Sequence, residues 1–290
     1  MKTDQHSRTA ESAAVARALH MQGPAPRIFE DPFAIDLVSP GMRRLLTNPV
    51  LRGLQRLLLG ALAPMAAGQV TVRSRFAEDA LEQAMAGGVS QYVLLSAGLD
   101  SFALRRPDLA ARLRVFEVDH PDTQRFKRAQ LQALGAALPE NLQFAPVDFE
   151  HEGIAEGLGR TSYDPGQRAF FSWLGTVPYL TEEAIFGALN AVVSLSPPGS
   201  ELVFDFGGPI ERIEPRDRRL IRKMLRYTAR RGEPLITFEE PERLLEKICA
   251  LGFDRIELLD HAKQDRRYCA GRADGLRVLP IAHLARLRRV

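Results

Sequence analysis

The chain has 290 residues, of which 45% are hydrophobic and 26% are charged, and this composition is typical of one large globular domain rather than of a disordered chain. Its 39 basic and 36 acidic residues leave a net charge of +3, and the basic residues do not alternate with aromatic ones, so we expect no nucleic-acid partner. The two cysteines, Cys249 and Cys269, lack the spacing of a metal site or of a disulfide framework, which predicts no metal and a reducing, cytoplasmic compartment.

Three stretches bear on membranes and on charged partners. Residues 1–12 are polar and lack the apolar core of a signal peptide. The most apolar stretch, 57–68, is too short to cross a bilayer, so we expect no membrane segment. The densest basic run, 216–231, is expected to be the solvated face of an amphipathic helix. Near a ligand site, such a face would also attract an acidic substrate.

The first part of the chain is predicted to be helical. A helix is expected over 7–20, and a short helix follows Asp31, which is predicted to be its N-cap. Residues 41–66 and 70–86 carry apolar side chains at helical spacing. About ninety residues therefore precede the first strand. We expect most of this helical segment to cover one end of the sheet as a lid.

Beyond residue 90, apolar runs of strand length alternate with helix-length segments, which predicts a parallel, doubly wound α/β sheet. Pro146 lies near the end of the third run, 142–149, and marks an edge strand, because proline cannot donate a hydrogen bond to a neighbour. The charged residues 207–232 interrupt the alternation as a helical insertion. The last strand is expected at 276–279 or at 281–287. The earlier runs are 92–95, 115–118, 142–149, 168–174, 201–206 and 255–259.

The stretch from Gln91 to Asp119 is organised like a nucleotide-binding βαβ unit, with a strand, a small-residue turn, a helix-length segment and a second strand. Gly98 in the turn lets a ligand approach the backbone closely. Asp119 follows 21 residues later, near the roughly 20 expected for a carboxylate that binds ribose hydroxyls. An ordinary α/β turn without a ligand is the alternative interpretation.

Two features of this turn argue against a dinucleotide. The dinucleotide fingerprint has three glycines, whereas Ser96 and Ser101 take the first and third positions here. The charge of Asp100 would repel a pyrophosphate, although it favours the start of the following helix. A ligand that has a ribose and no phosphates fits better, and we therefore predict S-adenosylmethionine as the cofactor.

Short motifs also occur in a fixed order along nearly the whole chain. They are Ser7-Arg8-Thr9-Ala10 with Arg17-Ala18, Arg27-Ile28-Phe29-Glu30-Asp31-Pro32, Arg73-Ser74-Arg75-Phe76, Ala97-Gly98-Leu99-Asp100-Ser101, Phe116-Glu117-Val118-Asp119-His120-Pro121, Val147-Asp148-Phe149, Pro178-Tyr179-Leu180 and Arg272-Ala273-Asp274-Gly275-Leu276. Together they resemble the leucine carboxyl methyltransferase-like family of class I S-adenosylmethionine-dependent methyltransferases, in its bacterial and actinomycete branch. The ordered set is more specific than any one motif.

For the fold, the resemblance implies a Rossmann-like sheet of seven strands whose last strand inserts antiparallel. It also implies that the N-terminal helices close over the cofactor. We accordingly expect a single methyltransferase domain over 1–290. Its parts are an N-terminal helical lid at 1–69, a cofactor-binding core at 70–206, a helical insertion after the fifth strand at 207–237 and the C-terminal part of the sheet at 238–290.

For the cofactor site, the resemblance places Ala97 and Gly98 against the methionine part of S-adenosylmethionine. It places Asp119 on the ribose hydroxyls, as the residues alone already indicated. Asp148 and the backbone of Phe149 would lie at the adenine. Without the resemblance, Asp148 is equally well interpreted as a cap at the end of a strand.

The remaining site residues are less well defined. Arg73 matches the family's arginine ahead of the first strand and would hold the methionine carboxylate, while His120 would flank the adenosine. Tyr179 is a candidate to orient the methyl acceptor, with core packing as the alternative. Two positions depart from the family pattern: Ser96 replaces the first glycine, and Leu174 stands where many members have a glutamate.

The predicted activity is S-adenosylmethionine-dependent O-methylation of a carboxylate or hydroxyl on a small molecule or a peptide terminus. A carboxylate acceptor is already ionised at neutral pH and needs no general base, which fits a chain without an evident catalytic dyad. A hydroxyl acceptor would need one, with histidine the usual candidate. The alternatives are an NAD(P)-dependent oxidoreductase, which the missing glycines disfavour, and a cofactor-binding scaffold without catalysis. The sequence does not indicate an oligomeric state.

Overall fold

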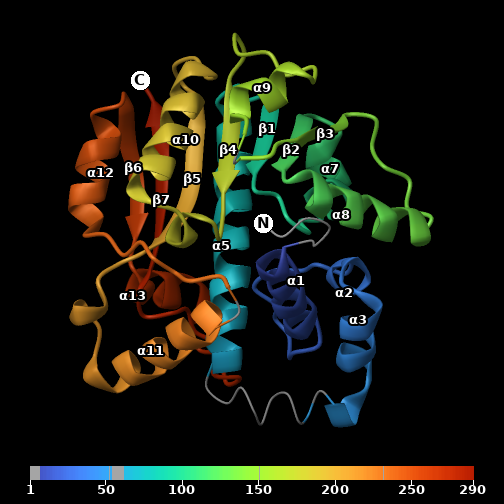
Figure 1. The fold of residues 1–290 in the computed structure, drawn as a ribbon, viewed down its shortest axis with the longest axis vertical. Helices are drawn as coiled ribbons and strands as arrows, with labels where there is room; N and C mark the ends of the chain where they lie inside the picture. The colour runs from blue at the N-terminus through green and yellow to red at the C-terminus, as the bar shows by residue number, and fades with distance from the viewer. Residues whose placement is uncertain (1–6, 52, 54–61, 150, 231) are drawn as a thin grey trace.

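The apolar runs predicted as strands form one seven-stranded sheet in the order β3-β2-β1-β4-β5-β7-β6 (Figure 1). The structure is a computed structural model that describes residues 7–51, 53, 62–149, 151–230 and 232–290. Strand β7 is antiparallel to both of its neighbours, as the family resemblance implied. The strands are β1 (Gln91–Leu95), β2 (Arg114–Asp119), β3 (Leu142–Pro146), β4 (Ala169–Trp173), β5 (Glu201–Gly207), β6 (Phe253–Leu259) and β7 (Ala282–Arg289).

The register of the central strands brings their carboxyl ends together. Leu95 at the end of β1 lies opposite Val118 of β2 on one side and Trp173 of β4 on the other. The segments that follow these three strands therefore leave the sheet along one edge, where ligands bind in doubly wound folds. Strand β3, which ends on Pro146, is an edge strand as predicted.

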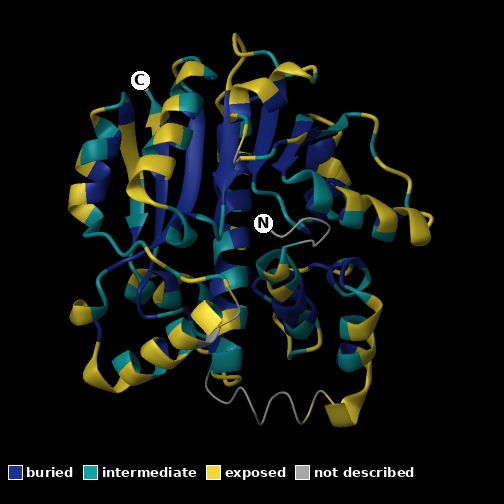
Figure 2. Ribbon diagram, viewed as in Figure 1, coloured by how far each residue is buried: buried dark blue, intermediate teal, exposed yellow. Residues whose placement is uncertain are grey.

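Helices cover both faces of the sheet, which confirms the doubly wound architecture. One face packs against α9 (Ile154–Gly159), α10 (Glu182–Ser194) and α12 (Pro241–Cys249) through a core that includes Phe171 and Phe204. The other packs against α5 (Leu62–Ala86), whose Phe76 is 1% exposed. Figure 2 shows the strands buried throughout the centre of the molecule. The further helices beside the sheet are α6 (Phe102–Arg105), α7 (Pro107–Ala110), α8 (Pro121–Ala133), α13 (His261–Gln264) and the π-helical turn η3 (Asp265–Cys269).

The N-terminal helices form a separate small core beyond the carboxyl ends of β1 and β2 (Figure 1). They are α1 (Arg8–Met21), α2 (Ala34–Leu37) and α3 (Pro40–Thr47). Helix α1 begins as predicted, because the side chain of Ser7 accepts a hydrogen bond from the backbone N–H of Ala10 at 3.1 Å. Leu99 of the turn after β1 packs into this core, so the lid rests directly on the predicted cofactor turn.

Two sequence expectations about the helices are wrong. Asp31 does not cap α2, whose N-cap is Phe33 without a side-chain hydrogen bond; Asp31 is instead 1% exposed and forms an ion pair. The helix expected after the turn is broken into α6 and α7, because Arg106 precedes Pro107 and leaves the helical conformation with φ −121° and ψ 58°. Of the two places expected for the last strand, 281–287 is the one that matches β7.

Helix α5 and the segment before it also differ from expectation. Helix α5 begins at Leu62 rather than at residue 70, whereas α3 ends at Thr47. The middle of the helix expected over 41–66, at 52 and 54–61, lies outside the described residues. Within the part of the chain that the structure describes, no helix is both long and apolar enough to span a membrane.

The charged segment after β5 is helical, as predicted. A short turn, η2 (Ile210–Arg212), leads to α11 (Pro215–Arg230), whose Ile221 is fully buried in a small satellite core. Figure 2 shows exposed residues along the outer side of α11. Beyond α11, the chain returns past the turn η1 (Val177–Tyr179), where the backbone N–H of Ile236 donates to the carbonyl oxygen of Pro178 at 2.7 Å.

Candidate functional site

A cavity of about 500 Å³ lies at the carboxyl ends of β1, β2 and β4. Its size falls within the range of about 300–1,000 Å³ that is usual for small-molecule sites. Helix α1 of the lid forms part of the cavity wall, and Glu233 in the segment after α11 forms another part. The eight residues that the sequence singled out all line it: Arg73, Ala97, Gly98, Asp119, His120, Asp148, Phe149 and Tyr179.

The turn after β1 is shaped by two residues in the left-handed conformation. Ser96 has φ 55° and Gly98 has φ 56°. A side chain on Gly98 would be strained at this φ, and its Cβ would lie 3.0 Å from the Cβ of Ala10 in the lid. Gly98 is therefore required for both the turn and the close approach of α1. Ser96 adopts the conformation that the family's usual glycine would favour, at a modest conformational cost.

Asp119 is held by the backbone on both of its oxygens. Its Oδ2 accepts the N–H of Gly98 at 2.6 Å, and its Oδ1 accepts the N–H of His120 at 2.7 Å. The residue is only 8% exposed, and this burial raises the pKa of the Asp119 carboxyl, although the two N–H groups oppose the rise. Each carboxylate oxygen can accept a further hydrogen bond, so Asp119 offers the cavity two acceptors in a fixed orientation.

The wall beside Asp119 combines a flat aromatic ring with polar groups. Phe149 follows β3 and is 49% exposed, which is unusual for a large apolar side chain and leaves its ring open to stack on a planar group. Asp148 precedes it, and its backbone N–H donates to Glu152 at 3.1 Å. His120 caps α8 by accepting the N–H of Asp122 at 3.2 Å.

Arg73 of α5 is fixed in the wall on the β4 side. Its guanidinium Nη1 lies 3.2 Å from Oδ2 of Asp205 on β5, and both side chains are largely buried. Gly175 faces it with φ 73°, and a Cβ there would lie 2.4 Å from Nη2 of Arg73. The backbone N–H of Gly175 donates to the other oxygen of Asp205. Glycine at this position thus makes room for a guanidinium that can bind a planar anion.

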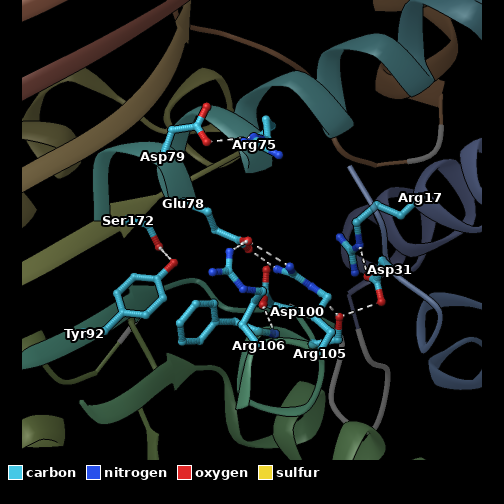
Figure 3. A network of polar contacts seen from close by, with 12 residues as sticks. Arg17, Asp31, Arg75, Glu78, Asp79, Tyr92, Asp100, Arg105, Arg106 and Ser172 are labelled. Atoms are coloured by element: carbon cyan, nitrogen blue, oxygen red, sulfur yellow. Dashed lines mark hydrogen bonds and ion pairs between the residues drawn. The ribbon is translucent and has the colours of Figure 1, made fainter. Parts of the chain in front are cut away.

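The lid is fastened to the cofactor turn by a buried polar network (Figure 3). Arg17 of α1 donates from Nε to Asp31 at 2.7 Å and from Nη2 to the carbonyl oxygen of Leu99 at 2.6 Å. Asp31 also accepts from the hydroxyl of Ser101 at 2.6 Å. Arg105 continues the network by donating to Ser101 at 3.1 Å and pairing with Glu78 of α5. The lid, the turn and α5 are therefore held as one unit.

Asp100 has the helix-start role that the sequence suggested. Its Oδ1 accepts the N–H of Phe102, the first residue of α6, at 2.7 Å. The carboxylate thus accepts from a backbone N–H at the helix start that would otherwise be unpaired. Unpaired N–H groups at helix starts are the groups that bind anionic phosphates. The backbone N–H groups of Gly98 and Phe102 are already bound by the carboxylates of Asp119 and Asp100.

The end of the cavity beside η1 is built from three segments that are distant in the sequence. Thr9 of α1 donates from its hydroxyl to Glu233, which follows it by 224 residues. Tyr179 of η1 lies near Thr9, and burial raises the pKa of its phenol. Sequence reasoning missed Thr9 and Glu233 as site residues, because no local pattern joins positions so far apart. Leu174 also lines the cavity and packs partly on the α5 side of the core.

The described residues contain no group of three or more histidine, cysteine, aspartate or glutamate side chains placed to hold a metal ion. The polar groups that line the cavity are carboxylates held by backbone N–H groups, an arginine and hydroxyls. This donor set suits hydrogen bonding to a polar organic molecule.

Comparison with known proteins relates the sequence to methyltransferases. The profile of the leucine carboxyl methyltransferase family matches residues 10–193. A Bacillus subtilis protein named "Putative S-adenosyl-L-methionine-dependent methyltransferase YktD" is 31% identical over 288 residues, covering 88% of this chain and 90% of that protein. A Mycobacterium avium protein with the same general name is 35% identical over 207 residues, covering 68% of this chain and 65% of its own length.

The fold recurs in a crystal structure of a DUF574 family protein from Streptomyces avermitilis. The two structures superpose with a TM-score of 0.65 over 99% of each chain, although only 14% of the residues are identical. This likeness concerns the fold alone, and it supports the seven-stranded Rossmann-like architecture.

Proposed function

Because the chain belongs to the leucine carboxyl methyltransferase family, we propose that it transfers a methyl group from S-adenosylmethionine to an oxygen atom. Its relatives carry the name "Putative S-adenosyl-L-methionine-dependent methyltransferase". The acceptor would be a carboxylate or a hydroxyl of a small molecule or a peptide terminus. The observation that carries the proposal is the pair Gly98 and Asp119, joined by a 2.6 Å hydrogen bond in the wall of a cavity that the lid covers.

The residues around the cavity fit this cofactor. Asp119 presents two fixed acceptors, which suit the two hydroxyls of a ribose. Ala97 and Gly98 would lie against the methionine part, because both line the cavity and neither has a side chain larger than a methyl group. Arg73, with its planar guanidinium set in the wall, would hold the methionine carboxylate.

Three further residues would hold the adenosine. Phe149 offers an exposed ring for stacking, Asp148 lies beside it, and His120 follows Asp119 at the start of α8. These roles for the cofactor residues are proposals that binding measurements on variants can test.

S-adenosylmethionine supplies a methyl group on a positively charged sulfur, and the chain's task is to align an acceptor with it and to exclude water. The lid helix α1 supports exclusion, because its Ala10 touches the turn at Gly98 and Arg17 fastens it. Tyr179 projects from η1 into the cavity and would orient the acceptor. Alignment of this kind accounts for much of the rate gain in two-substrate reactions.

The test is calorimetry with S-adenosylmethionine and S-adenosylhomocysteine, followed by turnover against a metabolite extract. We expect both compounds to bind and the extract to be methylated with release of S-adenosylhomocysteine. Folded protein that binds neither compound would contradict the proposal. Binding of a nicotinamide cofactor instead would favour an oxidoreductase, and binding without turnover in any extract would favour a non-catalytic scaffold.

A further inference from the structure

The end of the cavity lined by the segment after α11 holds three neighbouring side chains, Thr9, Tyr179 and Glu233. The Thr9 hydroxyl donates to Oε2 of Glu233. Burial raises the pKa of the Tyr179 phenol, and Thr9 and Glu233 also act on it, so the phenol lies near both groups.

The backbone around Glu233 is held against η1. The N–H of Glu233 donates to the carbonyl oxygen of Thr228 at 3.1 Å. Three residues later the N–H of Ile236 donates to Pro178 at 2.7 Å, and the hydroxyl of Thr237 donates to Leu180. The segment that carries Glu233 is thus fastened to the turn that carries Tyr179. The carboxylate is placed by the fold and is not a loosely held surface group.

Glu233 also has hydrogen-bonding capacity to spare. Only its Oε2 accepts a hydrogen bond from the part of the chain that the structure describes, and an ionised carboxylate can accept on both oxygens. Of the described arginines that line the cavity, Arg17 is paired with Asp31 and Arg73 with Asp205. Among the described residues, no ion-pair partner lies within 4.0 Å of Glu233.

This arrangement discriminates between the two acceptor classes of the proposed function. A carboxylate acceptor beside Glu233 would bring two negative charges together in a partly enclosed site, which is unfavourable. A hydroxyl acceptor can donate its hydrogen bond to Oε1 of Glu233, and it needs a base that takes its proton as the new bond forms. The negative charge of Glu233 would repel a carboxylate acceptor. The same carboxylate can serve as the base that a hydroxyl acceptor needs.

We propose that the methyl acceptor is an alcohol or a phenol and that Glu233 is its general base, held in place by the hydrogen bond from Thr9. The proposal rests on the proposed methyltransferase function. In the step, the acceptor oxygen bonds to the methyl carbon and the carbon–sulfur bond breaks, its electron pair staying on sulfur. The hydroxyl proton passes to Glu233, so the products are a methyl ether, a neutral thioether and a protonated carboxyl group.

The first test follows a labelled methyl group from S-adenosylmethionine into a metabolite extract and classifies the product by mild alkali. Methyl esters release methanol under alkali, whereas methyl ethers are stable. We expect alkali-stable label. Alkali-labile label would overturn the assignment of a hydroxyl acceptor while leaving the methyltransferase function intact. Failure of the protein to bind S-adenosylmethionine would instead overturn the proposed function itself.

Variants separate a base from a structural residue. Glu233→Gln keeps an oxygen that accepts from Thr9 but cannot take a proton, so label transfer should fall by about 100-fold or more, as is usual on loss of a general base. The affinity for S-adenosylmethionine should stay within about twofold, because the hydrogen bond that Glu233 accepts comes from Thr9 and not from a predicted cofactor residue. The matched control is Glu240→Gln, which removes a carboxylate paired with Arg212 outside the cavity and should change neither quantity. Unchanged transfer by Glu233→Gln would overturn the role of Glu233.

The second test needs no natural acceptor. Binding of benzoate and of benzyl alcohol, which have similar shapes, is measured on protein loaded with S-adenosylhomocysteine. Removal of the charge in Glu233→Gln should tighten benzoate by about tenfold and leave benzyl alcohol within about twofold, since only benzoate is repelled. Glu240→Gln should alter neither affinity. Benzoate that gains no affinity in Glu233→Gln would overturn the inference.

Discussion

The two ends of the cavity are built in different ways. At the end formed by β1 and β2, the backbone sets the geometry: two residues in the left-handed conformation shape the turn, and backbone N–H groups orient the carboxylate of Asp119. At the other end, side chains set the geometry, and Thr9, Tyr179 and Glu233 come from α1, η1 and the segment after α11. The first end depends on one short stretch of sequence, whereas the second depends on the whole fold.

The contacts that hold helix α1 of the lid also differ between the two ends of the cavity. Toward the turn after β1, α1 is fastened by a buried ion pair between Arg17 and Asp31, whose side chains are 7% and 1% exposed. Toward the insertion, α1 is fastened by one hydroxyl hydrogen bond from Thr9 to Glu233. Breaking a buried ion pair leaves a buried charge without its partner, which costs more than the loss of one hydrogen bond to a partly exposed carboxylate. We infer that the cofactor end is rigid and that the acceptor end can be altered at small cost in stability.

The largest expected effect comes from breaking the lid's buried anchor. Arg17→Met would leave the Asp31 carboxylate buried without its cation, which costs about 3–5 kcal/mol in the free energy of unfolding. Chemical denaturation measures this loss. Arg43→Met in the same lid is the control, because the pair of Arg43 with Asp36 is about one third exposed and should contribute about 1 kcal/mol or less. Equal losses for both variants would contradict the role of the buried pair of Arg17 and Asp31 as the lid's anchor.

The next effect concerns cofactor binding at Asp119. Asp119→Ala removes the two predicted acceptors of the ribose hydroxyls, and charge-assisted hydrogen bonds contribute about 1.5–3 kcal/mol each, so the affinity for S-adenosylmethionine should fall by about 100-fold or more. Calorimetry gives the dissociation constant. Asp108→Ala, at an exposed carboxylate outside the cavity, should leave it unchanged. Binding that survives in Asp119→Ala would remove the basis of the proposed cofactor site.

A smaller effect is expected at Arg73. Arg73→Lys keeps a positive charge beside Asp205 but loses the planar fork that suits a carboxylate, so affinity for S-adenosylmethionine should fall by about tenfold. Arg75→Lys is the matched control two residues later on α5, because the side chain of Arg75 is 51% exposed and pairs with Asp79. If the two variants lose affinity equally, the methionine carboxylate does not bind at Arg73.

The smallest effect is a pH dependence that also belongs to the cofactor end. Because burial raises the pKa of Asp119, this carboxyl takes up its proton at a higher pH than an ordinary aspartate, which does so near pH 4. Protonated Asp119 is a poorer acceptor for hydroxyls, so affinity for S-adenosylhomocysteine should be constant near neutral pH and fall a few-fold as the pH is lowered. Calorimetry at several pH values tests this. Asp119→Asn should lose this part of the dependence; a fall that persists in Asp119→Asn would assign it to another group.

The contrast between the two ends also explains what sequence reasoning could reach. The alternation of apolar runs predicted the doubly wound sheet, because strands buried on both faces are apolar throughout. Gly98 and Asp119 were found from their spacing, since a strand, a turn and a helix fix their separation. The backbone nitrogen of Gly98 lies 2.6 Å from Oδ2 of Asp119, while the contact of both residues with the cofactor stays a prediction.

Other features depend on contacts that no local pattern contains. Asp31 has the sequence signature of a helix cap, yet Arg17 and Ser101 bind it more favourably as a buried anchor. The joining of Thr9 with Glu233 needs the insertion to fold back over η1, which only tertiary structure decides. The break of the helix at Arg106 could have been predicted from the sequence, because Arg106 precedes Pro107 and a residue before proline rarely continues a helix.

The antiparallel strand β7 has a consequence for the order in which the molecule assembles. In the sheet that the described residues form, β6 is the edge strand and pairs with β7, and β7 also covers the open side of β5. Both pairings use residues 282–289, which the ribosome adds after all the other strands. During synthesis β5 therefore presents an unpaired edge and β6 has no place in the sheet. The sheet closes only when β7 emerges, so the core of this domain is completed after residues 282–289 have been synthesised.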